Sequence, residues 1–250
     1  MKHYFLFGFL FLVLSPVVHA QELRSDTPPD PEAIYYGIPI SPINTPVALL
    51  QIVYSSGEIA TCSGVVVKNE TLLTAAHCLV DGPISAIVIY AGGYGAYGVY
   101  YGVDANYIPL GLIAAESFFD IGYVKLDRKL PRSVKPAKLA SRYPAYGEWL
   151  FVYGFGRDEA NGVGALRGGV MQATGTDGVV IDAIRPPGGS ATCQGDSGGP
   201  AFIVKKQKPY LVGLTSYGGV SCSASTGFSS LLSPHAKSFI KLAKKKLKRR

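Results

Sequence analysis

The sequence predicts an all-β domain, either a barrel or a sandwich, followed by one C-terminal helix. Gly and Pro supply 30 and 17 of the 250 residues, so they interrupt most windows that are long enough for a helix. Between these interruptions lie short runs of β-branched and aromatic residues, each of strand length. Hydrophobic residues make up 48% of the chain and charged residues 16%, which excludes a disordered protein and provides apolar surface for a core.

The first 33 residues differ from the rest of the chain. Residues 1–20 begin with Lys2, continue with an apolar run over 4–14 and end on Val18-His19-Ala20. This pattern predicts a cleaved signal peptide, and the run is shorter than the roughly 20 residues that a membrane anchor needs. The mature protein is then secreted or periplasmic. Residues 21–33 are polar and contain three Pro, which is typical of a pro-segment or a linker.

The strand-like texture begins at Ile34 and continues to about residue 232. Within it, the stretch 91–102 is rich in Gly and Tyr, and we interpret it as strand edges and loops, with a low-complexity binding tract as the alternative. Turn signals separate the predicted strands. Their sequences are VALLQIVY, GVVV, AIVIY, IGYVKL, EWLFVYGF, VVIDAI, AFIV and YLVGLTSYG.

A helix is predicted over about 234–248. Ser233 is a favoured N-cap residue, and Pro234 suits the first helical position. Apolar residues then recur at helical spacing, at Ala236, Phe239, Ile240, Ala243 and Leu247.

The net charge of +7 is concentrated near the C-terminus. Residues 237–250 contain eight basic side chains and no acidic one. Without this segment and without residues 1–33, the chain has 14 basic and 13 acidic side chains. Any attraction for anions therefore belongs to the C-terminal segment rather than to the whole protein.

Four cysteines are expected to be paired in an oxidising compartment. Three pairings are possible, and local pairing would close two modest loops. No CxxC spacing is present, which argues against a metal site. The cysteines are Cys62, Cys78, Cys193 and Cys222.

Three segments have the residue types of nucleophilic catalysis. Ser197 lies between glycines in CQGDSGGP, where a tight turn could expose its hydroxyl. A serine nucleophile needs a base, and after residue 20 the chain has only His77, in TAAHC, and His235, at the start of the predicted helix. Asp120, in DIGYVKL, precedes an apolar strand and could orient the histidine.

In this order, TAAHC, DIGYVKL and CQGDSGGP resemble the chymotrypsin/trypsin family of serine endopeptidases over roughly residues 34–247. The resemblance implies two six-stranded antiparallel Greek-key β-barrels, at about 34–140 and 141–232, and a terminal helix at about 233–250. It also implies the disulfides Cys62–Cys78 and Cys193–Cys222.

The resemblance assigns roles to the residues of the three motifs. His77, Asp120 and Ser197 would form the catalytic triad. The backbone N–H groups of Gly195 and Ser197 would form the oxyanion hole.

The resemblance also implies a zymogen. A cut after Ala33 would free the α-ammonium of Ile34, which would pair with Asp196. Family activation sites have Arg or Lys before the cut, so Ala33 implies a different activating protease or self-processing. The alternative is that residues 21–33 are a linker that stays attached.

The implied primary specificity pocket has an uncharged base at Ala191, followed by Thr192, and small walls at Gly218 and Gly227. An unpaired substrate cation there would be costly to bury, so cleavage after Arg or Lys is disfavoured. We expect aromatic or large aliphatic P1 residues, with small aliphatic ones as the alternative. The edge strand that would pair with the substrate backbone contains Ser216, Tyr217 and Gly218.

The sequence thus predicts a secreted, monomeric serine endopeptidase that acts on proteins or peptides without a metal or other cofactor. Only Asp81 and Asp104 lie between His77 and Glu116, too few acids for a calcium loop. A function of another class is a secreted, non-catalytic binding protein on the same scaffold. It would dock to an anionic surface through the basic C-terminal helix.

Overall fold

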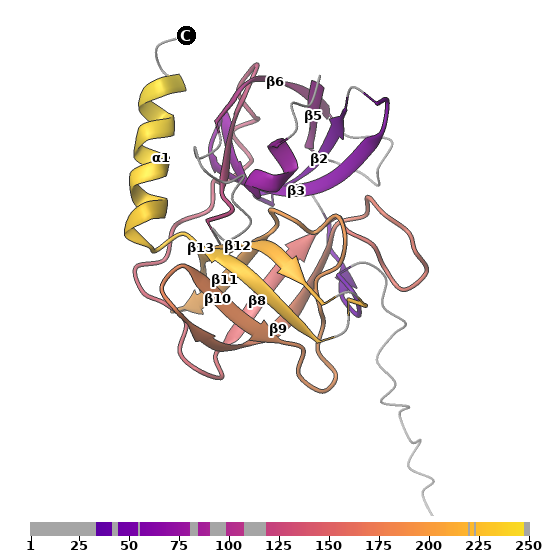
Figure 1. The fold of residues 1–250 in the computed structure, drawn as a ribbon, viewed down its shortest axis with the longest axis vertical. Coiled ribbons are helices and arrows are strands. Elements are labelled where there is room, and N and C mark those ends of the chain that lie inside the picture. Colours follow the sequence, from indigo (N-terminus) through magenta and orange to yellow (C-terminus); the bar gives the residue numbers. More distant parts are fainter. Residues whose placement is uncertain are drawn as a thin grey trace, which may run out of the picture.

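A computed structural model describes residues 34–41, 45–54, 56–80, 85–90, 99–107, 119–219, 221–222 and 224–247, and only the backbone of 85–90 and 99–107. The predicted signal peptide over 1–20 and the pro-segment over 21–33 lie outside the described residues, as do residues 91–98 of the Gly/Tyr-rich stretch. Figure 1 shows two β-barrels, one above the other, with a helix along one side.

The first barrel is a closed ring of six antiparallel strands in the order β2-β3-β4-β7-β6-β5. Its interior is filled by buried apolar residues such as Leu50, Ile52, Leu72 and Val124. The strands are β2 (Val47–Val53), β3 (Ile59–Lys68), β4 (Thr71–Thr74), β5 (Ser85–Tyr90), β6 (Val99–Tyr107) and β7 (Gly122–Leu126).

The second barrel is a ring of six strands in the order β8-β9-β10-β13-β12-β11, closed because β8 pairs with both β9 and β11. A short strand, β1 (Ile38–Pro39), adds to β9. The predicted all-β fold is confirmed. The ring strands are β8 (Trp149–Gly154), β9 (Arg167–Thr176), β10 (Val180–Ile184), β11 (Pro200–Lys205), β12 (Lys208–Gly218) and β13 (Ser225–Ser230).

The predicted first barrel begins at residue 34, but in the structure the segment that starts there packs on the second barrel. Ile38 pairs with Gly168 of the second barrel, and the fully buried side chain of Ile34 belongs to that barrel's core. The first barrel begins with β2 at Val47. Because the Ile34 side chain is buried there, this segment packs on the second barrel, although the first barrel is nearer to it in the sequence.

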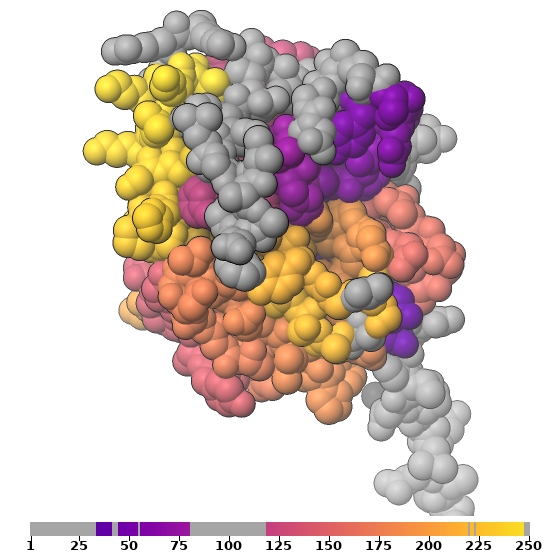
Figure 2. All heavy atoms as spheres, viewed as in Figure 1, coloured from indigo at the N-terminus to yellow at the C-terminus, as the bar shows by residue number. Residues whose placement is uncertain are grey.

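The terminal helix, α1 (Pro234–Leu247), is confirmed together with its cap. The Ser233 hydroxyl accepts a hydrogen bond from the backbone N–H of Ala236 at 3.0 Å. The five predicted apolar residues are all buried, in a cluster that contains Leu73 of the first barrel and Leu214 of the second. The helix thus joins the two barrels, and Figure 2 shows it (yellow) along one side of the molecule. No helix among the described residues is long and apolar enough to cross a membrane.

Candidate active site

Two disulfides border the candidate site. Cys62 bonds to Cys78, and Cys193 bonds to Cys222, which confirms the local pairing. The first bridge joins β3 to a 3₁₀ turn (η1, Ala76–Leu79) that contains His77. The sulfurs of Cys62 and Cys78 lie near a nitrogen of His77, but because they are bonded to each other they cannot act as a pair of metal ligands.

His77 and Asp120 form a two-point contact. The backbone N–H of His77 donates to Oδ1 of Asp120 at 2.8 Å, and the ring nitrogen Nδ1 lies 2.7 Å from Oδ2. The carboxylate is buried, whereas 46% of the His77 side chain is exposed. The imidazole is therefore held through Nδ1, which leaves Nε2 as the nitrogen available for proton transfer.

A third group also binds the Asp120 carboxylate. The Ser216 hydroxyl donates to Oδ2 at 2.7 Å. Burial raises the pKa of Asp120, but the hydrogen bonds from His77 and Ser216 and the attraction of His77 outweigh burial, so this pKa lies below its ordinary value. Asp120 is accordingly an anion at neutral pH. Sequence reasoning placed Ser216 on the substrate edge strand and missed this contact.

Ser197 lies on a turn between two glycines with positive φ, Gly195 at +94° and Gly198 at +80°. A Cβ atom on Gly198 would lie 2.1 Å from Oγ1 of Thr74, so only glycine lets this turn approach β4 so closely. The carbonyl of Ser197 accepts from the N–H of Ser63 at 2.8 Å. These contacts hold the second-barrel turn against the first barrel, from which the His77 segment comes.

Two backbone N–H groups of this turn are free to bind an anion. Among the described residues, the N–H groups of Gly195 and Ser197 donate no hydrogen bond. The carbonyl of Gln194 accepts from the N–H of Arg157 at 2.7 Å. Because a trans peptide places its C=O and N–H on opposite sides, the Gly195 N–H points away from Arg157.

Ser63 links the two barrels behind this turn. Its buried hydroxyl donates to the carbonyl of Gly195 and accepts from the N–H of Phe155, both at 2.9 Å. Sequence reasoning missed this residue because its partners lie more than 90 positions away along the chain.

Asp196 is fully buried and has no cationic partner among the described residues. Its carboxylate accepts from the N–H groups of Gly156 and Cys193, both at 2.8 Å. Burial dominates over these hydrogen bonds and raises the pKa of Asp196 to about 7. A Cβ atom on Gly156 would lie 2.6 Å from this carboxyl group, which explains the glycine there.

Ile34 is not bonded to Asp196 in this chain, in which its nitrogen is part of a peptide bond. Its φ of +41° lies in the left-handed region, which a β-branched residue rarely adopts. The next residues are docked on the second barrel, since the N–H of Ala191 donates to the carbonyl of Tyr35 at 2.8 Å. The ring of Tyr36 lies under the guanidinium of Arg185 at 3.7 Å.

Of the predicted pocket residues, Ala191, Thr192 and Gly218 lie together, whereas Gly227 faces the other side of its strand. Ala191 and Thr192 are buried, and the hydroxyl of Thr192 lies 2.7 Å from that of Thr226. A Cβ atom on Gly218 would point at Thr192, at 3.4 Å from its hydroxyl. By contrast, a Cβ atom on Gly227 would lie 2.1 Å from the ring of Tyr217.

The strand register explains this separation. Gly218 pairs with Thr226, and Tyr217 pairs with Gly227. Because neighbouring residues of a strand face opposite sides, Gly227 cannot line the same pocket as Thr192. Thr226 occupies the position that we expected glycine to fill.

A comparison with models of protein families shows to which family this chain belongs. The family model described as Trypsin matches residues 42–236. The chain belongs to the trypsin family.

The trypsin-family match extends to individual proteins. The chain is 28% identical over 183 residues to the venom protease of Bombus pensylvanicus, covering 63% of this chain and 74% of that protein. It is also 28% identical over 184 residues to serine protease SP24D of Anopheles gambiae, covering 67% and 66%.

Solved structures show the same fold. An HL collagenase matches with a TM-score of 0.67 and 20% identity, over 79% of this chain and 94% of that one. The protease Anisep of Arthrobacter nicotinovorans matches with a TM-score of 0.66 and 20% identity, over 82% and 97%.

Proposed function

We propose that this trypsin-family chain is a secreted serine endopeptidase that cleaves proteins or peptides through an acyl-enzyme. The observation that supports this most strongly is the contact of His77 with an ionised, buried Asp120, together with the glycine turn that holds Ser197 against the first barrel. Ser197 Oγ would attack the scissile carbonyl carbon while His77 removes its proton. The N–H groups of Gly195 and Ser197 would stabilise the resulting oxyanion.

The second half of the reaction uses the same groups. His77 would return the proton to the leaving amine as the C–N bond breaks, which leaves the acyl group on Ser197. A water molecule, deprotonated by His77, would then hydrolyse the ester and regenerate the serine. Asp120 stays ionised and stabilises the imidazolium in both halves.

We further propose that the chain is a zymogen that a protease activates by cutting after Ala33. The unpaired, buried Asp196 supports this, since a buried carboxylate favours a cationic partner. The positive φ of Ile34 supports it as well, because φ is no longer constrained once the preceding peptide bond is cut. The freed ammonium of Ile34 would pair with Asp196.

For the P1 residue, the pairing of β12 with β13 favours small uncharged side chains. The sequence alone predicts aromatic or large aliphatic P1 residues, with small aliphatic ones as the alternative. Thr226 replaces a glycine wall, and its contact with Thr192 narrows the space next to Ala191. Ala191, which we place at the base of the pocket, has no charge that could pair with Arg or Lys.

This specificity can be tested by profiling the processed enzyme on a peptide library. We expect cleavage after Ala or Val to exceed cleavage after Phe, and Thr226→Gly to improve kcat/KM for Phe relative to Ala about tenfold. Thr226→Ser, which removes one methyl group, is expected to have a smaller effect. Dominant cleavage after Arg or Lys would refute this account of the pocket.

We also expect Ser63 to act as a positioning residue. Ser63→Ala leaves the Phe155 N–H and the Gly195 carbonyl without their shared partner, so kcat should fall about tenfold with little change in KM. Ser230→Ala is the matched control, because the Ser230 hydroxyl is equally buried but accepts from the N–H of Leu232, at 3.1 Å, rather than from a group of the Ser197 turn. A Ser63→Ala variant with a lower Tm and an unchanged kcat would show that Ser63 is purely structural.

A further inference from the structure

A basic groove of about 540 Å³ lies between α1 and the first barrel. Five lysines and one glutamate line it, three of the lysines coming from the helix and two from the strands. They are Lys241, Lys244, Lys245, Lys68, Lys125 and Glu70. In this basic groove cationic side chains thus outnumber acidic ones five to one.

Four of the five lysines in the basic groove are not neutralised by an ion pair within the part of the chain that the structure describes. Among the described residues, Lys68, Lys241, Lys244 and Lys245 form no ion pair. Burial, and secondarily the charge of Lys68, lowers the pKa of Lys244. Like charges drawn together across a cavity destabilise the free protein, and an anion between them would relieve this repulsion.

The shape of the basic groove distinguishes among anionic partners. Lysines line the groove from the helix and from two strands, whereas a membrane surface would need them on one plane. Single-stranded nucleic acid binds through exposed aromatic side chains as well as cations. The aromatic residue among the groove's described lining, Tyr123, is only 4% exposed, and its hydroxyl contacts that of Thr71.

We propose that this basic groove binds a linear sulfated polysaccharide, with Lys68 and Lys244 on opposite walls contacting successive sulfate groups. Lysines line this groove from both the helix and the sheet, and sulfates need cations but no stacking surface. This inference is independent of catalysis. It goes beyond the charge of the C-terminal segment because two of the lysines belong to β3 and β7.

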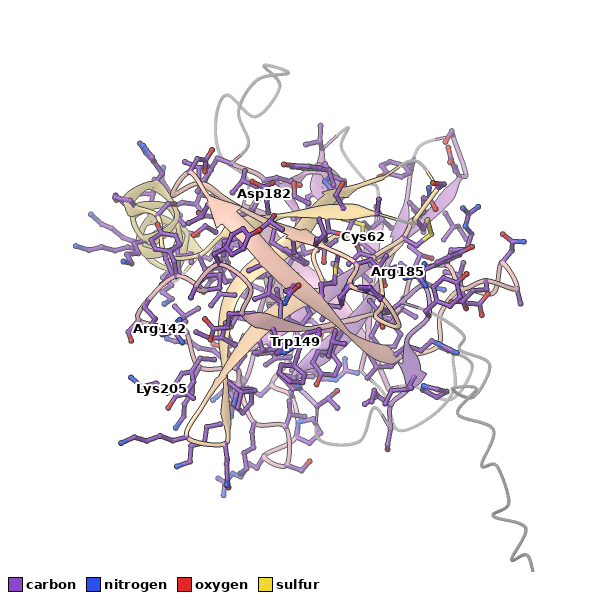
Figure 3. All side chains as sticks on the ribbon, turned by 90° about the horizontal axis from the view of Figure 1, so that it is seen from below. Cys62, Arg142, Trp149, Asp182, Arg185 and Lys205 are labelled. Atoms are coloured by element: carbon purple, nitrogen blue, oxygen red, sulfur yellow. A yellow bond between two sulfur atoms is a disulfide. The ribbon has the colours of Figure 1, made fainter. Side chains whose placement is uncertain are left out.

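The test uses the full chain with Ser197→Ala, which prevents self-digestion, and a heparin-derived dodecasaccharide as the probe in titration calorimetry. Lys68→Glu together with Lys244→Glu should weaken binding about tenfold and reduce its dependence on salt. The matched control is Lys205→Glu with Lys208→Glu, which changes the net charge equally. Lys205 lies on the second barrel, well away from α1 (Figure 3).

Further variants and ligands test whether the binding is specific to these lysines and to a sulfated polysaccharide. If the charge-reversed pair fails to fold, judged by circular dichroism, Lys68→Gln with Lys244→Gln replaces it. Equal weakening by the control pair would overturn the proposal, since binding would then follow net charge alone. It would also be overturned if a chain ending at Leu247 lost binding while the Lys68 and Lys244 variant kept it. Tighter binding of single-stranded DNA or of phosphatidylserine vesicles through the same lysines would exclude the polysaccharide.

Discussion

Replacing Ser197 by alanine in the processed protein is expected to lower kcat for peptide hydrolysis by about 10⁶-fold. His77→Ala should cost about as much, because the hydroxyl without its base is a poor nucleophile at neutral pH. The double variant should be little worse than either single one, since the two residues act as a unit. Steady-state hydrolysis of a peptide amide measures all three.

The control for these variants is Ser141→Ala, which removes an exposed hydroxyl from the second half of the chain. It should leave kcat unchanged. Hydrolysis that persists within about tenfold of the parent rate in Ser197→Ala would assign the nucleophile to another residue.

Blocking the new N-terminus is expected to have the second largest effect. A processed chain that begins one residue before Ile34 cannot place an ammonium beside Asp196. Removing one partner of a buried ion pair typically costs about 3–5 kcal/mol, so activity should fall by between about a hundredfold and several thousandfold. Full activity of the extended chain would contradict the proposed activation.

The burial of Asp196 in the uncut chain predicts that the free energy of unfolding depends on pH. In the uncut chain the pKa of Asp196 is about 7, above its ordinary value of 3.8, so the folded state holds a proton that the unfolded state has released between these values. The contribution of Asp196 to the free energy of unfolding should therefore be largest below about pH 4 and fall as the pH rises to about 7, by up to about 4 kcal/mol.

Urea unfolding of the uncut Ser197→Ala chain at several pH values measures this change. Adding Asp196→Asn should abolish it, and cleavage after Ala33 should abolish it too, because the Ile34 ammonium keeps the carboxylate ionised. An uncut chain whose stability rises steadily from pH 4 to 7 would disagree with an unpaired Asp196.

Local signals in the sequence predicted the features that depend on neighbouring residues. Ser233-Pro234 predicted the cap of α1, and the apolar spacing predicted its buried face. The motif around Ser197 predicted a turn that needs glycine on both sides, and φ is positive at Gly195 and Gly198.

Features that depend on tertiary contacts could not be predicted in this way. A shift of one residue in the pairing of β12 with β13 decides whether Thr226 or Gly227 faces the pocket, and nothing in the local sequence fixes that register. The docking of Ile34 on the second barrel and the bridge made by Ser63 join residues more than 90 positions apart. The basic groove likewise needs Lys68 and Lys125 beside the helix, which only the folded chain brings about.

The most direct test of the central claim, that His77 and Asp120 activate Ser197, is labelling with a fluorophosphonate that reacts covalently with activated serines. In a chain cut after Ala33, mass spectrometry should find the label on Ser197, and the His77→Ala variant should lose it. A correctly cut, folded sample in which Ser197 stays unlabelled would contradict the claim and favour a non-catalytic binding protein on the same scaffold.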